Sequence, residues 1–439
     1  MRTTEPVNKV TRLVVEPRII SRSEHAISRS DISENALKVL YRLKNAGYKA
    51  YLVGGSVRDL LLNLKPKDFD VVTDARPEQI RELFRNCRLI GRRFRLAHVR
   101  FGDEIIEVST FRAAHHMAEG EGHIEDGRII RDNVYGDIDD DVWRRDFTVN
   151  ALFYNIEDFS IVDYVGGLND IKERQLRLIG DPAGRYREDP VRMLRAVRFA
   201  VKLGFTLHPS AEQPLFNMDH LLRDISPSRL FEEFMKLFMS GAALKTYHQL
   251  RHYGLFKHLF PETSLMLEDD TNGYADRLFS AVFLNTDNRI AEGKPVTPGF
   301  LIAALMWLPM MRLAEDYKSN GLAEMDAVQL ASDAVISRQI NAIALPRRFT
   351  LMAREIWNLQ SRLKHRRGNR PSRLLSHPRF RAAYDFLLLR YEAGEKLQEL
   401  VDWWTEFVEK NGDKITVSAA HGRGNKSRRR PVRKKNHFR

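Results

Sequence analysis

The chain has 439 residues, more than one typical hydrophobic core holds, so we expect two or three domains. A hydrophobic share of 43% and a charged share of 29% are typical of a globular protein in water, and without an apolar run of about 18 residues we expect no membrane span. Cys87 is the only cysteine, which excludes an intramolecular disulfide and a cysteine-based zinc site and indicates a reducing, cytoplasmic setting.

Positive charge is concentrated near the C-terminus. The net charge is +13, but nine Lys and Arg residues and no acid lie in 421–439, so the first 420 residues carry only +4. A second block, 362–381, has eight Lys and Arg residues and again no acid. Such clusters favour a polyanionic partner through counterion release, so we expect nucleic acid, with a solubilising tail as the alternative. We expect the tail to be disordered when unbound.

The first roughly 160 residues are expected to form a mixed α/β domain. A helix over 31–45 is closed by Gly47, and a strand over 48–53 runs into Gly54-Gly55-Ser56. Further helices are expected over 57–62 and 77–85, and further strands over 69–72, 89–90, 97–101 and 105–110.

Helices dominate the second half of the sequence. We expect a long mobile loop over 113–135 and no strands beyond Gly180. Helical apolar spacing occurs over 190–203, 228–239, 244–253, 299–313, 325–336 and 386–400. The predicted fold class is therefore α+β: an α/β head with a mixed sheet, an all-helical neck and body, and a disordered basic tail.

Two carboxylates stand out in Lys67-Asp68-Phe69-Asp70-Val71. Alternation along a strand would place Asp68 and Asp70 on one face, about 7 Å apart, where they repel each other unless a divalent cation lies between them. Mg²⁺ prefers oxygen ligands and takes one or two protein carboxylates. A solvated strand face is the alternative for this pair alone. The Gly54-Gly55 turn nearby would let a backbone approach an anion, although a plain tight turn remains the alternative there.

A third acid, Glu107, lies on a strand whose residues Ile106, Val108 and Thr110 share the opposite face. Two-metal phosphoryl transfer uses a further carboxylate near the attacking hydroxyl, and Glu107 fits that role or that of an ordinary strand glutamate. Arg144 to Leu152 is expected to enter an amphipathic helix and supplies Arg, Asp and Asn side chains suited to phosphate and ribose.

Asp139-Asp140-Asp141 resembles a metal cluster, but acids at the start of a helix usually serve capping and the helix dipole. Further along the chain, Pro190 fixes the start of a helix with Asp189 as its N-cap. The four arginines around that start favour an anionic or planar ligand, and a surface helix with salt bridges is the alternative.

These motifs in this order resemble the class II nucleotidyltransferases, which comprise bacterial poly(A) polymerases and CCA-adding enzymes. The resemblance covers about Leu37 to Phe205. It implies that Asp68 and Asp70 bind two catalytic Mg²⁺ ions, with Glu107 as third carboxylate, and that ATP is the substrate. The nucleotide-binding residues that it implies are Gly54, Gly55, Ser56, Arg58, Arg145, Asp146, Asn150, Asp189, Arg192 and Arg195.

Within those residues, the resemblance implies that the Gly-Gly turn and Arg58 handle the triphosphate. Arg145, Asp146 and Asn150 would hold phosphate and ribose. Asp189 with Arg192 would read the base edge, and Arg195 would reach the triphosphate. The RNA 3′-hydroxyl would attack the α-phosphorus and pyrophosphate would leave.

The stretch Leu89 to Val99 is similar to the segment that distinguishes bacterial poly(A) polymerases from CCA-adding enzymes. We therefore predict template-independent addition of AMP to RNA 3′ ends, with CCA addition to tRNA as the first alternative and a non-catalytic RNA-binding protein as the second. The role of His98 in this stretch stays open. The predicted RNA-binding residues are Arg92, Arg93, Arg95, Arg366, Arg367, Arg428, Arg429 and Arg430.

The predicted organisation is an extension (1–32), a head (33–175), a neck (176–240), a helical body (241–410) and a basic tail (411–439). RNA 3′ ends and ATP are the expected partners, with RNA-decay proteins as further candidates. A monomer without a membrane span is expected.

Overall fold

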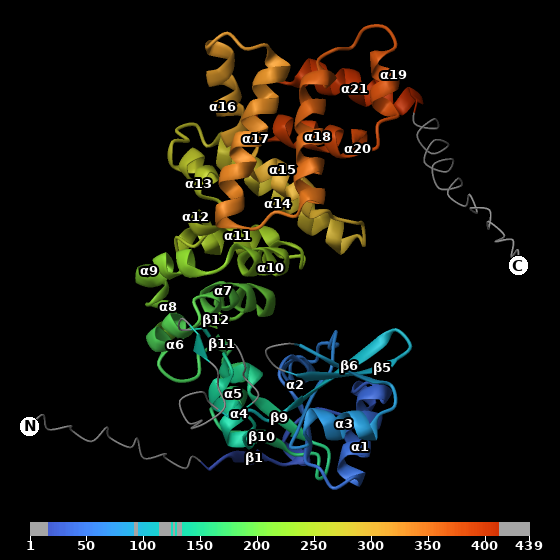
Figure 1. Cartoon of the computed structure of the whole chain (residues 1–439), viewed down its shortest axis with the longest axis vertical. Helices are drawn as coiled ribbons and strands as arrows, with labels where there is room; N and C mark the ends of the chain where they lie inside the picture. Colours follow the sequence, from blue (N-terminus) through green and yellow to red (C-terminus); the bar gives the residue numbers. More distant parts are fainter. Residues whose placement is uncertain (1–15, 92–94, 114–123, 126–127, 130–133, 412–439) are drawn as a thin grey trace, which may run out of the picture. The chain divides into compact units, whose positions relative to one another are not determined.

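A computed structural model describes residues 16–91, 95–113, 124–125, 128–129 and 134–411. By its internal contacts the chain divides into two units, Met1–Met218 and Asp219–Arg439. The first unit contains a mixed sheet, and the described part of the second is helical (Figure 1). This confirms the predicted fold class. The division falls inside the segment predicted as the neck, and the finer domain boundaries stay predictions.

Eight strands form the sheet of the first unit in the order β1-β10-β9-β2-β3-β6-β5-β4. Only β3 and β6 are parallel; every other neighbouring pair is antiparallel. The strands are β1 Arg18–Ile20, β2 Ala50–Val53, β3 Asp70–Thr73, β4 Cys87–Ile90, β5 Leu96–Phe101, β6 Glu104–Thr110, β9 Leu152–Asn155 and β10 Ile161–Asp163.

Helix α1, Glu34–Asn45, packs on this sheet. The Ser33 hydroxyl accepts the Ala36 N–H at 3.3 Å to start the helix, and Gly47 at a φ of +88° follows its end, as the sequence predicts. The other helices of this unit are α2 Gly55–Leu61, α3 Pro77–Leu83, α4 Ile138–Arg144, α5 Gly167–Lys172, α6 Pro182–Glu188, α7 Val191–Leu203, α8 Pro209–Glu212 and α9 Leu215–Met218.

The segment predicted to enter a helix near Arg145 does the opposite. Helix α4 ends there, a 3-10 turn spans Thr148–Asn150, and strand β9 follows in the sheet. The prediction was wrong because residues 151–154 are all fully buried, so this apolar run forms an inner strand and not one face of a helix. Strands β1 and β10, also unpredicted, extend the sheet beyond β9.

Two further short pairs lie outside the main sheet. β11, Gln175–Leu176, pairs in parallel with β12, Thr206–Leu207, which corrects the expectation of no strand beyond Gly180. Most of the predicted loop 113–135 lies outside the described residues. Its described part contains a two-stranded pair, β7 Ile124–Glu125 and β8 Arg128–Ile129.

The second unit is built on helices. After a 3-10 segment, Asp219–Asp224, its helices are α10 Pro227–Phe238, α11 Ala243–His252, α12 Phe256–Leu259, α13 Pro261–Glu268, α14 Tyr274–Ala291, α15 Pro298–Leu305, α16 Trp307–Ser319, α17 Glu324–Ala342, α18 Arg347–Leu363, α19 Arg370–Leu375, α20 Phe380–Glu392 and α21 Gln398–Asn411. One of its cores packs Trp404 against Phe380 and Leu363.

Two predicted helices of this unit have wrong boundaries. The expected helix 299–313 is two helices, α15 and α16, which meet at Met306. The expected helix 386–400 is the end of α20 and the start of α21, separated where Gly394 adopts a φ of +105°. Within the described ranges, no helix is long and apolar enough to cross a membrane.

Candidate active site

Two acidic residues lie side by side in the middle of the sheet. Asp70 is the first residue of β3, and its register partner on the parallel strand β6 is Glu107. Neighbouring strands lie about 4.8 Å apart and register partners project to the same face, so these carboxylates share one site. Asp68 lies just before the strand and, like Asp70, is exposed, so the shared face expected for the two carboxylates stays a prediction.

The environment disfavours ionisation of Asp70. Although this residue stays partly open to solvent, the protein around its carboxyl removes hydrating water. This desolvation raises the pKa of the carboxyl from 3.8 to about 6. The negative charges of Glu107 and Asp68 add to this increase in pKa, and Arg145 opposes it. The site therefore carries an excess of negative charge that a cation would compensate.

These carboxylates fit Mg²⁺ better than a metal that needs a full protein cage. Within the described ranges, no group of three or more His, Cys, Asp and Glu side chains is arranged to hold a metal ion. Mg²⁺ is usually bound by one or two carboxylates, with water and substrate phosphates completing its shell. Asp70 and an acid beside it meet that requirement.

His98 on β5 is the register partner of Glu107 on the other side of β6. Its Nε2 lies 3.1 Å from Glu107 Oε1, at an angle that does not make a hydrogen bond. The residue that the sequence left without a role therefore lies directly against the predicted third carboxylate.

The Gly-Gly turn reaches the same place from the neighbouring strand. β2 ends at Val53, the register partner of Asp70, and Gly54 then turns the chain with a φ of +75° into α2. A Cβ added at Gly54 would lie 3.7 Å from Arg145 Nη1. Glycine adopts this positive φ without strain, whereas a residue with a Cβ does not, which explains the first glycine of the turn.

Arg145 is held beside that turn by an acid one helical turn earlier. Its Nε and Nη2 donate to Asp141 Oδ2 at 2.9 and 2.6 Å, and its guanidinium lies 5.1 Å from the centre of the Phe153 ring. The three acids of α4 do occupy its first turn, with Asp137 as N-cap. Asp141, however, also orients Arg145, which the sequence did not reveal because the pairing depends on where α4 ends.

A second network connects Asp146 to Arg195 of α7. Arg195 Nε donates to Asp146 Oδ2 at 2.9 Å, and the other oxygen of Asp146 accepts from the Phe147 N–H at 2.8 Å and from Asn150 Nδ2 at 3.3 Å. Burial raises the pKa of Asp146, but the charge of Arg195 and these hydrogen bonds outweigh it, so the pKa lies below its ordinary value of 3.8. Asp146 is therefore ionised and rigidly held.

Arg58 also belongs to this network, and its predicted role at the triphosphate stays a prediction. Its side chain is only 3% exposed, its Nη1 donates to Asn150 Oδ1 at 2.6 Å, and its Nε donates to Asp59 Oδ1 at 2.8 Å. With Arg58 on one side and Asp146 on the other, the Asn150 amide has a single orientation.

The acid and arginine predicted to read a base lie where α6 meets α7. Asp189 Oδ1 accepts the Val191 N–H at 3.2 Å, so it caps α7 although Pro190 holds the N-cap position. Arg192 Nη1 donates to Glu188 Oε2 at 2.7 Å and to the Arg185 carbonyl at 2.9 Å. Glu188 thus holds Arg192, a role that the sequence did not indicate.

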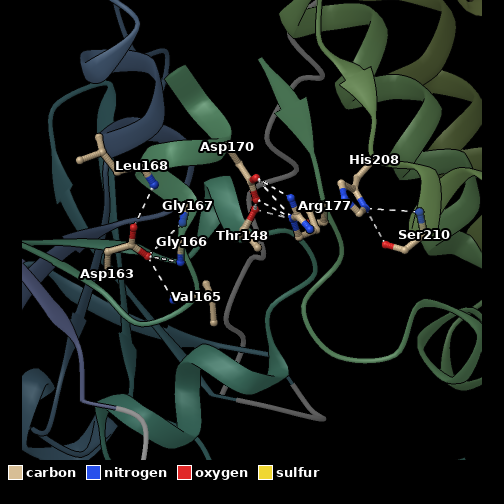
Figure 2. Close-up of polar contacts among 10 residues, drawn as sticks. All are labelled: Thr148, Asp163, Val165, Gly166, Gly167, Leu168, Asp170, Arg177, His208 and Ser210. Carbon is tan, nitrogen blue, oxygen red and sulfur yellow. Dashed lines mark hydrogen bonds and ion pairs between the residues drawn. The ribbon is translucent and has the colours of Figure 1, made fainter. Parts of the chain in front are cut away.

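The segment from Arg145 to Asn150 is also held in place by polar contacts of Thr148 (Figure 2). The Thr148 hydroxyl donates to Asp170 Oδ2 at 2.6 Å, and Arg177 Nε lies 3.3 Å from the same oxygen. The Thr148 N–H donates to the Arg177 carbonyl at 3.0 Å. A Cβ at Gly167 would lie 2.3 Å from the Thr148 carbonyl oxygen, so only glycine allows this approach.

Asp163 anchors the helix that carries Asp170 (Figure 2). Its two carboxylate oxygens accept four backbone N–H groups, those of residues 165, 166, 167 and 168, at 2.9 to 3.1 Å.

We expect Asp163→Ala to lower the free energy of unfolding by about 2 kcal/mol, because a buried cap with several donors lies at the upper end of capping energies. Urea unfolding measures this, and Asp158→Ala, which removes an exposed turn acid, should cost clearly less. Equal costs would contradict the anchoring role.

The predicted RNA-binding arginines are spread over both units. Arg95 pairs with Glu78, and Arg366 Nη2 lies 2.8 Å from Glu399 Oε1. Arg367 is exposed. The remaining predicted residues, Arg92, Arg93, Arg428, Arg429 and Arg430, lie outside the described residues.

A mixed sheet that brings acids together beside a Gly-Gly turn, with an arginine and an asparagine held nearby, defines a nucleotidyltransferase-type head. Three family models match the chain: "Poly A polymerase head domain" over residues 50–177, "Probable RNA and SrmB- binding site of polymerase A" over 204–267, and "Polymerase A arginine-rich C-terminus" over 320–437.

The chain is 52% identical over 396 residues to poly(A) polymerase I of Salmonella typhimurium, covering 89% of this chain and 85% of that relative. The chain belongs to the poly(A) polymerase family. A CCA-adding enzyme of Lactobacillus helveticus is 40% identical over 207 residues, which is 47% of this chain and 50% of that enzyme. The fold also matches a solved CCA-adding enzyme with a TM-score of 0.61 at 20% identity, over 87% of this chain and 85% of that one.

Proposed function

We propose that the chain is a polynucleotide adenylyltransferase, which adds AMP from ATP to RNA 3′ ends without a template and releases pyrophosphate. The observation that carries this proposal is the register pairing of Asp70 with Glu107 beside the Gly54 turn. Membership of the poly(A) polymerase family over nearly the whole chain supports the same activity.

Asp68 and Asp70 would hold two Mg²⁺ ions, with Glu107 as the third carboxylate. When bound, the metal ions supply Lewis acidity and lower the pKa of an attacking hydroxyl. The protein would supply the negative charge that attracts them through these carboxylates; desolvation and then the charge of Glu107 raise the pKa of Asp70. Below pH about 6, protons compete for this carboxylate, so we expect weaker metal binding there.

The chain's other residues would position ATP. Arg145, which lies beside Gly54, would meet phosphate oxygens, and Asp141 keeps its fork oriented. Asp146 and Asn150 would bind phosphate and ribose. Arg58, being buried, would act by orienting Asn150.

The base would be read at the neck. Asp189 and Arg192, between α6 and α7, would offer an acceptor and a donor fork to the base edge, and Glu188 fixes the donor. Arg195 on α7 would reach the triphosphate while its Nε stays with Asp146.

The extent of similarity favours poly(A) addition over CCA addition. The poly(A) polymerase I match spans 89% of the chain, whereas the match to the CCA-adding enzyme of Lactobacillus helveticus spans 47%. The acid-free basic block 362–381 and the basic tail suit an enzyme that holds generic RNA backbone. We further propose a cytoplasmic monomer that acts alongside RNA-decay proteins.

Supplying each nucleotide separately tests the proposal. The protein is incubated with Mg²⁺ and an RNA with a free 3′-hydroxyl, and products are resolved by length. Long ladders with ATP only are expected. Addition of two C and one A to a tRNA lacking its end would favour the CCA alternative, and no incorporation would favour a non-catalytic RNA-binding protein.

Deleting 420–439 is expected to weaken RNA binding and flatten its salt dependence. Up to nine phosphate contacts would be lost with the nine cations of this tail. At about −0.7 per contact, the slope of log K against log salt should fall in magnitude by up to about 6. Binding measured at several salt concentrations shows this directly, and an unchanged slope would contradict a role for the tail in RNA binding.

A further inference from the structure

The helical unit contains a pocket of about 360 Å³ that none of the predicted site residues lines. It is bounded by α14, the loop after it, and the starts of α15 and α20, with Met352 of α18 at its side. Its volume lies in the range of small-molecule sites, about 300–1,000 Å³, and is large enough for one nucleotide but not for a folded domain.

Arginines dominate the charged lining of this pocket. Arg289, Arg379 and Arg381 face a single acid, Asp385. Arg379 Nε donates to Glu355 Oε2 at 2.9 Å, and Arg381 Nε lies 2.8 Å from Asp385 Oδ1. Among the hydrogen bonds of the described residues, none involves the Nη atoms of Arg379 or Arg381, so each arginine keeps terminal donors available while its Nε pairs with an acid. This arrangement suits a phosphate group.

The rest of the lining suits a base. Phe300 is half-buried, with its ring edge-on to Phe386 at a centroid distance of 6.2 Å. Met352 and Val296 add apolar surface. Asn285 is half-buried, and within the described ranges its amide has no hydrogen-bond partner. An amide that offers both a donor and an acceptor can bind a base edge.

We propose that this pocket binds one unstacked nucleotide of the RNA strand, with its phosphate at Arg379 and Arg381 and its base at Phe300 and Asn285. This inference rests on the proposed RNA-extending function. Three cations around an apolar wall favour RNA over an acidic protein segment, because a carboxylate side chain would leave the aromatic and amide groups unused. Such a contact adds affinity for RNA without involving Asp70, which lies in the other unit.

Binding of an oligoadenylate to the full-length protein without ATP tests the phosphate contact. The double variant Arg379→Gln/Arg381→Gln is expected to bind about tenfold more weakly. Its salt slope should be smaller by about 1.4, the value for two contacts on a single strand. The matched control is Arg312→Gln/Lys318→Gln, which removes two exposed, acid-paired cations of α16 outside the pocket and should leave binding nearly unchanged. Equal losses in both double variants would overturn the proposal.

A base-free oligomer tests the base contact. Asn285→Ala should weaken oligoadenylate binding several-fold with an unchanged salt slope, and it should not affect an abasic oligomer of the same length. Ala382→Phe, which fills the pocket, should reproduce this selectivity, and thermal unfolding shows whether the variant is folded. If the two variants weaken binding of both oligomers equally, or leave binding of both oligomers unchanged, no base occupies the pocket.

Incorporation of ATP in the same preparations separates the two proposals. If the wild type extends RNA while the pocket variants bind RNA normally, the pocket proposal alone fails. If the wild type does not extend RNA but the variants bind as expected, the polymerase proposal alone fails.

Discussion

Asp70→Asn should reduce nucleotide incorporation by at least about a thousandfold, because one of the carboxylates that would hold the metal ions is lost. Asparagine keeps the shape of the side chain, so the sheet should be undisturbed. RNA binding without ATP should be unchanged. Primer extension with Mg²⁺ and ATP measures the loss.

The matched control for this substitution is Asp103→Asn. Asp103 lies in the exposed turn between β5 and β6 of the same sheet, and within the described ranges its side chain has no partner. This variant should extend RNA like the wild type. Activity near wild type in Asp70→Asn would contradict the metal assignment, and equal losses in both variants would point to a general effect of charge.

Asp70→Asn should also stabilise the metal-free protein. The pKa of Asp70 is raised in the folded state, so its ionisation costs stability as pH rises from 3.8 to about 6, and the cost persists above that. Because Asp70 is partly open to solvent, we expect only about 2 °C in Tm at neutral pH. The gain should disappear as pH falls below 3.8, where the wild-type carboxyl is protonated in both states. A variant less stable than wild type at neutral pH would contradict this environment for Asp70.

Asp146→Ala should lower the free energy of unfolding by about 3 kcal/mol, because it leaves Arg195 without its buried partner. The Asp146 side chain is 11% exposed and also holds Asn150, so the loss extends to the predicted ribose contact. Incorporation should fall strongly even where the variant is folded. The pKa of Asp146 is lowered, so its stabilising effect is present above 3.8 and fades as pH falls further.

Urea unfolding of a double-mutant cycle with Arg195→Met isolates this pair. Because methionine removes the charge that would be stranded, the double variant should be less destabilised than the sum of the single variants. Glu157→Ala, which removes an exposed acid in the turn before β10, is the control and should cost little. Strictly additive effects would contradict a coupled pair.

Much of the fold and the family could be predicted from the sequence because the signals are local. The apolar alternation around Glu107 predicts its strand, and the buried Ile106 and Val108 confirm it. Buried residues Met193, Leu194 and Val197 likewise confirm the core face of α7.

Longer-range arrangements could not be predicted. The run after Arg145 was assigned to a helix because an inner strand and a buried helix look alike in a short apolar stretch. The contact between Arg58 and Asn150 joins residues 92 positions apart, and no local pattern encodes it. For the same reason, the sequence does not show that three donors of Arg58 bond to Asn150 and Asp59.

The residue types around Asp68, Asp70, Glu107 and Arg145 by themselves determined the chemistry that this chain is suited for, because metal and phosphate ligation demand particular side chains. Only the tertiary structure decided how they are arranged in space. Pairing of β3 with β6 places Asp70 beside Glu107, and the junction of α4 with β9 turns Arg145 towards Asp141. These arrangements depend on strand order and burial, which are properties of the packed chain and not of any short segment.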